Sequence, residues 1–200
     1  MNIMAKVLRY KNIYCEIKKR KPTNILEIGT WNGKTANKML KVASKYVKKP
    51  IYYGFDLFED FTKEMAITEH CPKKPSTFRA VKNLLKKTFS KAQINLIQGN
   101  TKETLAKIHL PIMDFIFIDG GHSTETIQSD WENLQKVISK DTVILFDDYY
   151  EKIDTKNIGC NTVIKKIQDS SKYSIELLDP VDHLRENNLF IRIVKVNKLN

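Results

Sequence analysis

Short apolar runs alternate with amphipathic segments along nearly the whole chain, and this alternation restricts the fold more than any other feature. The runs are continuous in apolar character rather than alternating between apolar and polar residues. Strands with that pattern are buried on both faces, and segments with apolar residues at helical spacing lie between them. The pattern predicts an α/β fold, with a mostly parallel sheet that is covered by helices on both faces.

The run boundaries predict seven strands, at Asn24–Ile28, Ile51–Phe55, Ile94–Ile97, Met113–Ile118, Thr142–Phe146, Tyr173–Leu178 and Asn188–Val196. Helices are expected at Ala5–Lys19, Lys34–Val47, Ser76–Phe89, Lys102–Ile108, Thr124–Ile138 and Thr162–Ser170. Only Asp179–Asn187 joins the last two strands, which is too short for a helical crossover, so we expect an antiparallel hairpin there. The predicted fold is therefore a Rossmann-like, seven-stranded, mostly parallel sheet with an antiparallel C-terminal hairpin.

The length of 200 residues fits a single domain, which we expect to span residues 1–200. Within it, residues 1–21 hold the N-terminal helix. Residues 57–91 interrupt the alternation and form an insert at the carboxyl end of the second strand, where binding loops and lids are common. We interpret this insert as a lid or substrate segment.

Charge and cysteine content limit the partners and the compartment. The 34 basic and 23 acidic residues give a net charge of +11, but the lysines are scattered in pairs, which favours a solvated surface. The three cysteines are too few and too far apart for a disulfide framework or a zinc cluster, which favours a reducing, cytoplasmic setting. No signal-type segment and no apolar run of membrane-spanning length is present, so no membrane partner is expected.

The predicted strands are followed by polar groups and glycines at their carboxyl ends, where open α/β sheets bind ligands. The first strand leads into the pattern E-x-G-x-x-x-G-x-T, with Gly29 and Gly33. Glycines there allow a tight turn and a close ligand approach, and the next helix presents free N–H groups. Trp31 replaces the middle glycine that admits a pyrophosphate in nicotinamide enzymes, and no P-loop is present. The turn therefore suits a nucleoside without a phosphate chain.

Asp56 ends the second strand and supports the same interpretation. A carboxylate at that position accepts hydrogen bonds from both ribose hydroxyls of a bound nucleoside. The alternative is that Asp56 caps a turn, since aspartate often does so.

With these motifs, the sequence resembles the class I S-adenosylmethionine (SAM)-dependent methyltransferases from Ile25 to Asp148. The resemblance implies that Gly29 and Gly33 hold the amino-acid end of SAM and that Asp56 binds its ribose. It also implies that Glu27 orders the turn and that Asn100, where the family often has aspartate, reads the adenine amine. The cofactor-binding set implied in this way is Glu27, Gly29, Thr30, Gly33, Asp56, Leu57, Asn100, Thr101 and Asp119.

Motifs in the second half of the chain resemble those of one group within this family. The F-I-D-G-G-H run at 117–122 and the D-D pair at 147–148 look like the F-I-D-G-x-H … D-D pattern of metal-dependent small-molecule O-methyltransferases. That group includes sugar O-methyltransferases that act on macrolide and aminocoumarin antibiotics. The resemblance implies methyl transfer from SAM to a small-molecule hydroxyl.

Asp119, Asp147 and Asp148 follow two strands and are the expected ligands of a divalent metal. Oxygen-only ligation favours Mg²⁺ or Ca²⁺, and a bound Mg²⁺ stabilises a substrate alkoxide. Asp147 and Asp148 are adjacent, so in an ideal strand they point to opposite faces. The site therefore requires a break in the strand; otherwise one aspartate caps the next turn.

His122, three residues after Asp119, is the expected general base, and Asp119 and His122 form the catalytic set. A metal-bound water or another aspartate is the alternative base.

Nucleic-acid methylation is the first competing interpretation, because of the net charge of +11. Residues 119–122 lack the N/D-P-P-Y/F turn of base N-methylation, and no cysteine nucleophile for C5 methylation follows the fourth strand. RNA ribose methylation stays open, as does a cofactor-binding member of the family with a different metal-dependent activity.

The acceptor that we expect is a small molecule, either a sugar or an anionic compound because the insert is rich in lysine. The chain gives no signal for its oligomeric state, and a homo-oligomer is allowed.

Overall fold

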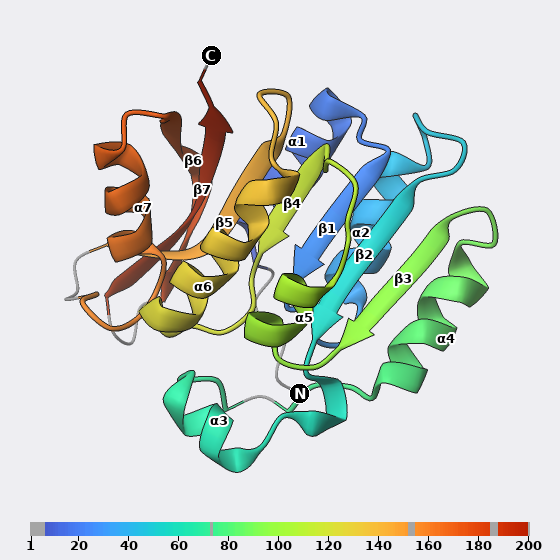
Figure 1. Cartoon of the computed structure of the whole chain (residues 1–200), viewed down its shortest axis with the longest axis horizontal. Helices are drawn as coiled ribbons and strands as arrows, with labels where there is room; N and C mark the ends of the chain where they lie inside the picture. The colour runs from blue at the N-terminus through green and yellow to red at the C-terminus, as the bar shows by residue number, and fades with distance from the viewer. Residues whose placement is uncertain (1–6, 73, 152–154, 185–187, 200) are drawn as a thin grey trace.

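The structure, a computed structural model, describes residues 7–72, 74–151, 155–184 and 188–199. It contains a seven-stranded sheet in the order β3-β2-β1-β4-β5-β7-β6 (Figure 1). The first five strands in sequence pair in parallel, and β7 is antiparallel to both β5 and β6. The strand bounds are β1 Asn24–Ile28, β2 Ile51–Asp56, β3 Gln93–Gln98, β4 Phe115–Ile118, β5 Val143–Glu151, β6 Tyr173–Leu184 and β7 Leu189–Lys198. The predicted mostly parallel sheet with a C-terminal hairpin is confirmed.

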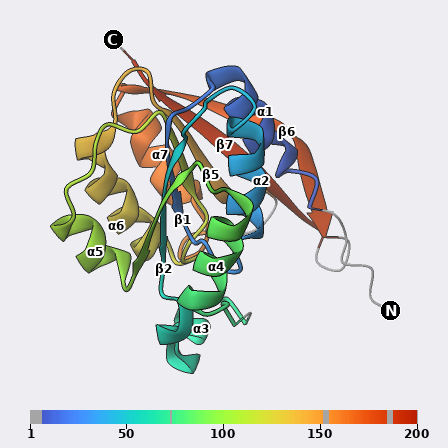
Figure 2. The same ribbon diagram turned by 90° about the vertical axis from the view of Figure 1, so that its right-hand side faces the viewer.

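Helices cover both faces of the sheet (Figure 2). One face carries α1 (Lys11–Arg20), α2 (Lys34–Ala43) and α4 (Phe78–Thr88). The other carries α5 (Thr101–Lys107), α6 (Thr124–Leu134) and α7 (Asn161–Asp169). The short elements are η1 (Phe58–Asp60), α3 (Lys63–Thr68) and η2 (Gln135–Val137). No helix in the described part of the chain is long and apolar enough to cross a membrane.

β4 shows why the apolar runs are continuous. Phe115 and Phe117 pack into the core under α1, α2 and α4, whereas Ile116 and Ile118 pack into the core under α5, α6 and α7. All four side chains are buried, and burial of each contributes roughly 1.5–3 kcal/mol to folding. The strand therefore needs apolar residues on both faces, as the sequence pattern predicted.

Helix ends differ from the sequence prediction near the N-terminus. The predicted helix Ala5–Lys19 begins at Lys11, and its first two residues lie outside the described residues. The backbone N–H of Leu8 donates to Asp182 on β6, which holds this segment outside the helix. The predicted helix Lys34–Val47 ends at Ala43, and its last residues continue as a tighter turn, in which Lys45 N–H donates to Val42.

Strands β5 and β6 are longer than predicted because bulges interrupt their periodicity. β5 continues past Phe146 to Glu151 through a register shift between Phe146 and Tyr149. β6 continues past Leu178 to Leu184 through a shift between Leu178 and Asp182. Residues 179–184 of the predicted connection Asp179–Asn187 are therefore strand, and residues 185–187 lie outside the described residues. A bulge hides a strand from pattern analysis, since it shifts the alternation by one residue.

The insert at 57–91 divides into two parts. η1 and α3 lie beyond the carboxyl ends of the strands, whereas α4 runs alongside the sheet (Figure 1). Val81 and Leu85 of α4 are buried in the core, so this helix is part of the main fold. Only the segment from η1 through α3 has the position that we expected for a lid.

Candidate functional site

The turn after β1 is tied to the ends of β2 and β4. Gly29 has φ +88° and its N–H donates to Phe55 O at 2.9 Å. A Cβ on Gly29 would lie 1.8 Å from the carbonyl oxygen of Asp119, so only glycine fits between the two strand ends. Gly33, with φ +71°, opens α2 and supplies no side-chain cap. The turn is tight, as predicted, and the close approach of Asp119, which follows β4, is what requires its first glycine.

Glu27 supports this turn through Tyr52, a residue that the sequence analysis missed. Both side chains are fully buried, and the Tyr52 hydroxyl donates to the Glu27 carboxyl group. The Tyr52 hydroxyl also lies 3.3 Å from the Thr30 hydroxyl in the turn. Burial raises the pKa of Glu27 to about 8. Glu27 and Thr30 therefore lie inside the protein, where their role is to hold the turn.

Asp56 connects the turn to the start of the insert. Its Oδ2 accepts the N–H of Trp31 at 2.6 Å, and its Oδ1 accepts the N–H of Phe58 at 2.7 Å. Burial raises the pKa of Asp56, although these backbone donors oppose the shift. The capping role is therefore present. Ribose binding by Asp56 stays a prediction. Each carboxylate oxygen has a second lone pair, which could accept a hydrogen bond from a ribose hydroxyl.

The remaining predicted cofactor residues lie next to the ends of β2 and β3. Leu57 follows Asp56 and precedes η1, and Thr101 opens α5. The Asn100 side-chain oxygen accepts the N–H of Lys102 at 3.0 Å, which caps α5. The capping role orients the Asn100 amide, and its contact with adenine stays a prediction.

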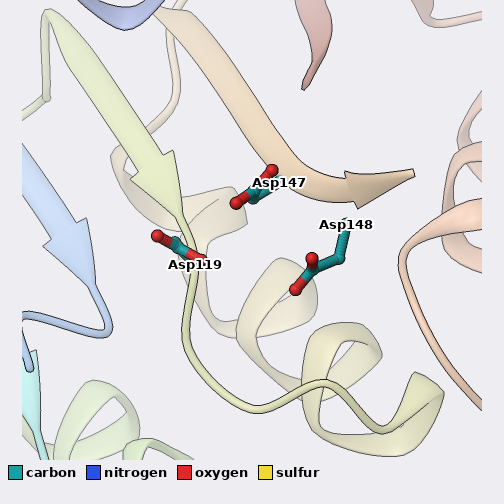
Figure 3. A group of neighbouring side chains, drawn as sticks. All are labelled: Asp119, Asp147 and Asp148. Carbon is teal, nitrogen blue, oxygen red and sulfur yellow. The ribbon is translucent and has the colours of Figure 1, made fainter. Parts of the chain in front are cut away.

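The three aspartates converge where β4 ends and where the bulge interrupts β5 (Figure 3). Asp119, Asp147 and Asp148 each offer an oxygen within 4.8 Å of the others. The bulge between Phe146 and Tyr149 is the break that the sequence analysis required, and Asp148 has φ +59° there. The bulge disrupts the alternation of side chains, so two adjacent residues of one strand reach the same site.

His122 lies beside this cluster, in the loop between β4 and α6. Its Nε2 is 3.3 Å from Asp148 Oδ2, and its side chain is 25% exposed. The structure thus brings together the predicted catalytic pair and the predicted metal ligands. Its partial exposure leaves the imidazole accessible to a bound substrate.

Comparison with known proteins identifies the family. The sequence between residues 26 and 149 matches the family model described as a methyltransferase domain. The chain belongs to this methyltransferase family. No curated protein matches the sequence.

Solved structures show the same fold for this methyltransferase. The SAH-bound methyltransferase PaMTH1 of Podospora anserina is 17% identical, with a TM-score of 0.65, over 98% of this chain and 80% of that chain. The O-methyltransferase of Bacillus cereus with SAH is 16% identical, with a TM-score of 0.63, over 94% and 80%. The O-methyltransferase NovP is 18% identical, with a TM-score of 0.68, over 96% and 80%. The fold is that of the class I, SAM-dependent methyltransferases.

The aspartate cluster of the methyltransferase brings buried acidic groups close together, which disfavours their charged forms. Burial, followed by the charges of Asp147 and Asp148, raises the pKa of Asp119 well above its usual range. Burial and Asp147 also raise the pKa of Asp148. Buried carboxylates this close together need a positive charge beside them. The donor set fits a hard divalent cation, because it consists of carboxylate oxygens only.

Arg9 supplies one positive charge and Tyr10 supplies a hydrogen bond to this cluster, and the sequence analysis missed both. The Arg9 guanidinium donates to both oxygens of Asp147, from Nε at 2.6 Å and from Nη2 at 2.7 Å. The Tyr10 hydroxyl donates to Asp119 Oδ2 at 2.5 Å. Burial lowers the pKa of Arg9, but the carboxylates outweigh burial and raise it, so the guanidinium is charged. The N-terminal segment therefore contributes directly to the site.

Glu69, at the end of α3, fastens the projecting part of the insert to α6. Its carboxylate accepts the N–H of Ser123 at 2.8 Å and the hydroxyl of Thr126 at 2.7 Å. These donors lie at the N-terminus of α6, where a negative charge is favourable. The insert of the methyltransferase is thus held against the loop that carries His122.

Proposed function

We propose that this methyltransferase transfers the methyl group of SAM to a hydroxyl group of a small molecule, and that a divalent cation such as Mg²⁺ assists. The observation that carries the proposal is the convergence of Asp119, Asp147 and Asp148 beside the turn that follows β1. Three proteins of the same fold support it. PaMTH1 and the Bacillus cereus enzyme bind SAH, and the latter and NovP are O-methyltransferases.

The cofactor would lie across the carboxyl ends of β1, β2 and β4. In this proposal the backbone of the turn from Gly29 to Gly33 holds the amino-acid end of SAM, and Asp56 binds the ribose. Leu57, Asn100 and Thr101 line the position of the adenine. The N–H of Lys34 at the start of α2 donates to the Asn32 side chain at 3.0 Å, and the other N–H groups of the first turn, which Gly33 leaves without a side-chain cap, face a carboxylate favourably.

His122 is the residue that we assign to proton removal. If its Nε2–H donates to Asp148, Nδ1 carries the lone pair that accepts the proton of the acceptor hydroxyl. The acceptor oxygen then forms a bond to the methyl carbon as the bond from that carbon to the sulfonium breaks, which leaves SAH and a methyl ether. A bound divalent cation would lower the pKa of the hydroxyl and orient it. Placing the two reactants in line supplies much of the rate.

The acceptor that we propose is a sugar or another small molecule, and an anionic one in particular. Lys63 and Lys74 of the insert are exposed. Positive charge on an insert beside the site would attract an anionic acceptor.

We also propose a cytoplasmic location, because the three cysteines are free and a reducing compartment keeps them so.

Transfer of labelled methyl groups from SAM to a panel of sugars, nucleotide-linked sugars and phenols tests the proposal. Each acceptor is tried with Mg²⁺, with Mn²⁺ and with a chelator. The proposal expects methyl ether products that require the cation, and loss of that requirement or of activity in Asp147→Asn. Methyl transfer to RNA alone, or to nitrogen alone, would overturn it.

A further inference from the structure

The segment before α1 reaches across the molecule to the aspartate cluster. Besides its two bonds to Asp147, the Arg9 guanidinium donates from Nη1 to Asp182 on β6 at 2.7 Å. The N–H of Leu8 donates to the other oxygen of Asp182 at 2.7 Å. Together with the bond from Tyr10 to Asp119, these contacts close the cluster from the side of the N-terminal segment.

These contacts use the atoms that a metal ion would need. A magnesium ion binds carboxylate oxygens at about 2.0–2.1 Å and takes about six oxygen ligands. Both oxygens of Asp147 instead accept hydrogen bonds from Arg9, which is also 3.9 Å from Asp148. A dication on the same oxygens would lie beside a buried guanidinium, and the two positive charges would repel each other.

We propose that Arg9 and a divalent cation are alternative occupants of the aspartate cluster, so that residues 7–10 act as a latch that the cation displaces. The inference rests on the proposed metal-assisted function. Arg9 offsets part of the negative charge of the carboxylates while no metal is bound, and its release opens the position that the acceptor must reach. Tyr10, which contacts Asp119, is released together with it.

The local structure allows this release without unfolding. α1 begins only at Lys11 and stays anchored in the core through Ile13 and Ile17, both of which are fully buried. Val7 and Leu8 are 43% and 40% exposed, so their movement uncovers little apolar surface, whereas the Tyr10 ring packs edge-on against Phe117 with ring centroids 5.9 Å apart. The latch is thus held by the ion pairs of Arg9 and by the packing of Tyr10, and a competing cation can replace the ion pairs.

Calorimetric titration of the full chain with Mn²⁺ tests the proposal on wild type, Arg9→Gln and Asp182→Asn. Asp182 is outside the three metal ligands, so its substitution weakens the latch alone. We expect both variants to bind Mn²⁺ about tenfold more tightly than wild type, a usual size for coupling between two ligands. Arg20→Gln is the matched control, because Arg20 is on α1 but faces Asp114, 3.5 Å away, and should leave the affinity unchanged.

Hydrogen exchange gives a second readout that does not depend on activity. Saturating Mn²⁺ should speed exchange of the Leu8 amide in wild type, because Leu8 moves away from its acceptor Asp182 on β6 when the latch is released. Equal Mn²⁺ affinity in wild type and both latch variants would overturn the inference while the proposed metal site stands. Failure of every protein to bind Mn²⁺ would overturn the metal assignment itself, and the latch with it.

Discussion

The backbone N–H of Trp31 donates a 2.6 Å hydrogen bond to the carboxylate of Asp56, which joins the turn after β1 to the end of β2. The same carboxylate holds the N–H of Phe58 at the start of the insert. One side chain therefore sets the positions of both segments that we expect around the ribose of SAM. The loss of Asp56 should disturb the geometry of the cofactor site as well as its hydrogen bonding.

Gly29→Ala should be severely destabilising. Its Cβ would lie 1.8 Å from the Asp119 carbonyl oxygen, and φ is +88°. We expect a loss of more than about 3 kcal/mol, since backbone strain and a backbone clash add. Thermal unfolding measures it against Gly99→Ala, which also carries the strain of a positive φ (+126°) but whose Cβ meets only a side-chain methyl group of Thr104 at 3.1 Å, so the difference between the two variants reports the backbone clash. An equal loss in both variants would contradict the close approach of the two strand ends.

Glu27 should make stability fall as pH rises. Its pKa is about 8 in the folded protein and near 4.5 when exposed, so the folded state holds a proton that the unfolded state has lost. This contribution is fully present below pH 4.5 and is lost as pH rises through 8. The free energy of unfolding of Glu27→Gln, measured between pH 5 and pH 8, should therefore decline less steeply than that of wild type. Parallel curves would show that Glu27 does not titrate there.

His122→Asn should slow catalysis while cofactor binding persists. Loss of a general base lowers kcat by about 10²- to 10⁴-fold, whereas no contact of His122 serves the turn after β1. The measurement is kcat for the identified acceptor, together with the affinity for SAH. His109→Asn, at an exposed position, is the control. A variant with wild-type kcat would assign proton removal to another group.

Glu69→Gln should loosen the projecting part of the insert. Hydrogen bonds from Ser123 and Thr126 to the charged carboxylate are worth about 1.5–3 kcal/mol each, and a neutral amide retains only part of that. Limited proteolysis within residues 61–72 should become faster, with little change in thermal unfolding of the sheet. Unchanged cleavage would mean that other contacts hold the insert.

The sequence was sufficient to predict the sheet, because strands buried on both faces require continuous apolar runs such as Phe115–Ile118. It was also sufficient to predict which residues meet at the carboxyl edge, since parallel strands end together there. A break in β5 could be predicted, because a shared metal site needs Asp147 and Asp148 on one side of the strand. The position and type of the break could not be predicted, because two adjacent aspartates are compatible with several kinds of bulge.

Arg9 and Tyr10 were beyond sequence analysis for a different reason. Arg9 is 138 positions from Asp147, and a single arginine before a helix has no periodicity or motif to connect it with a strand end. Tyr52 was missed because an aromatic residue in a buried strand is typical of a core. Its bond to Glu27 depends on the register between β1 and β2.

Calorimetric titration with SAH, on wild type and on Asp56→Ala, tests the central claim most directly. We expect micromolar binding to wild type, lost in Asp56→Ala, while circular dichroism shows that the variant remains folded. Absence of SAH binding to folded wild type, with or without Mg²⁺, would contradict the proposed cofactor site and the methyl transfer that depends on it.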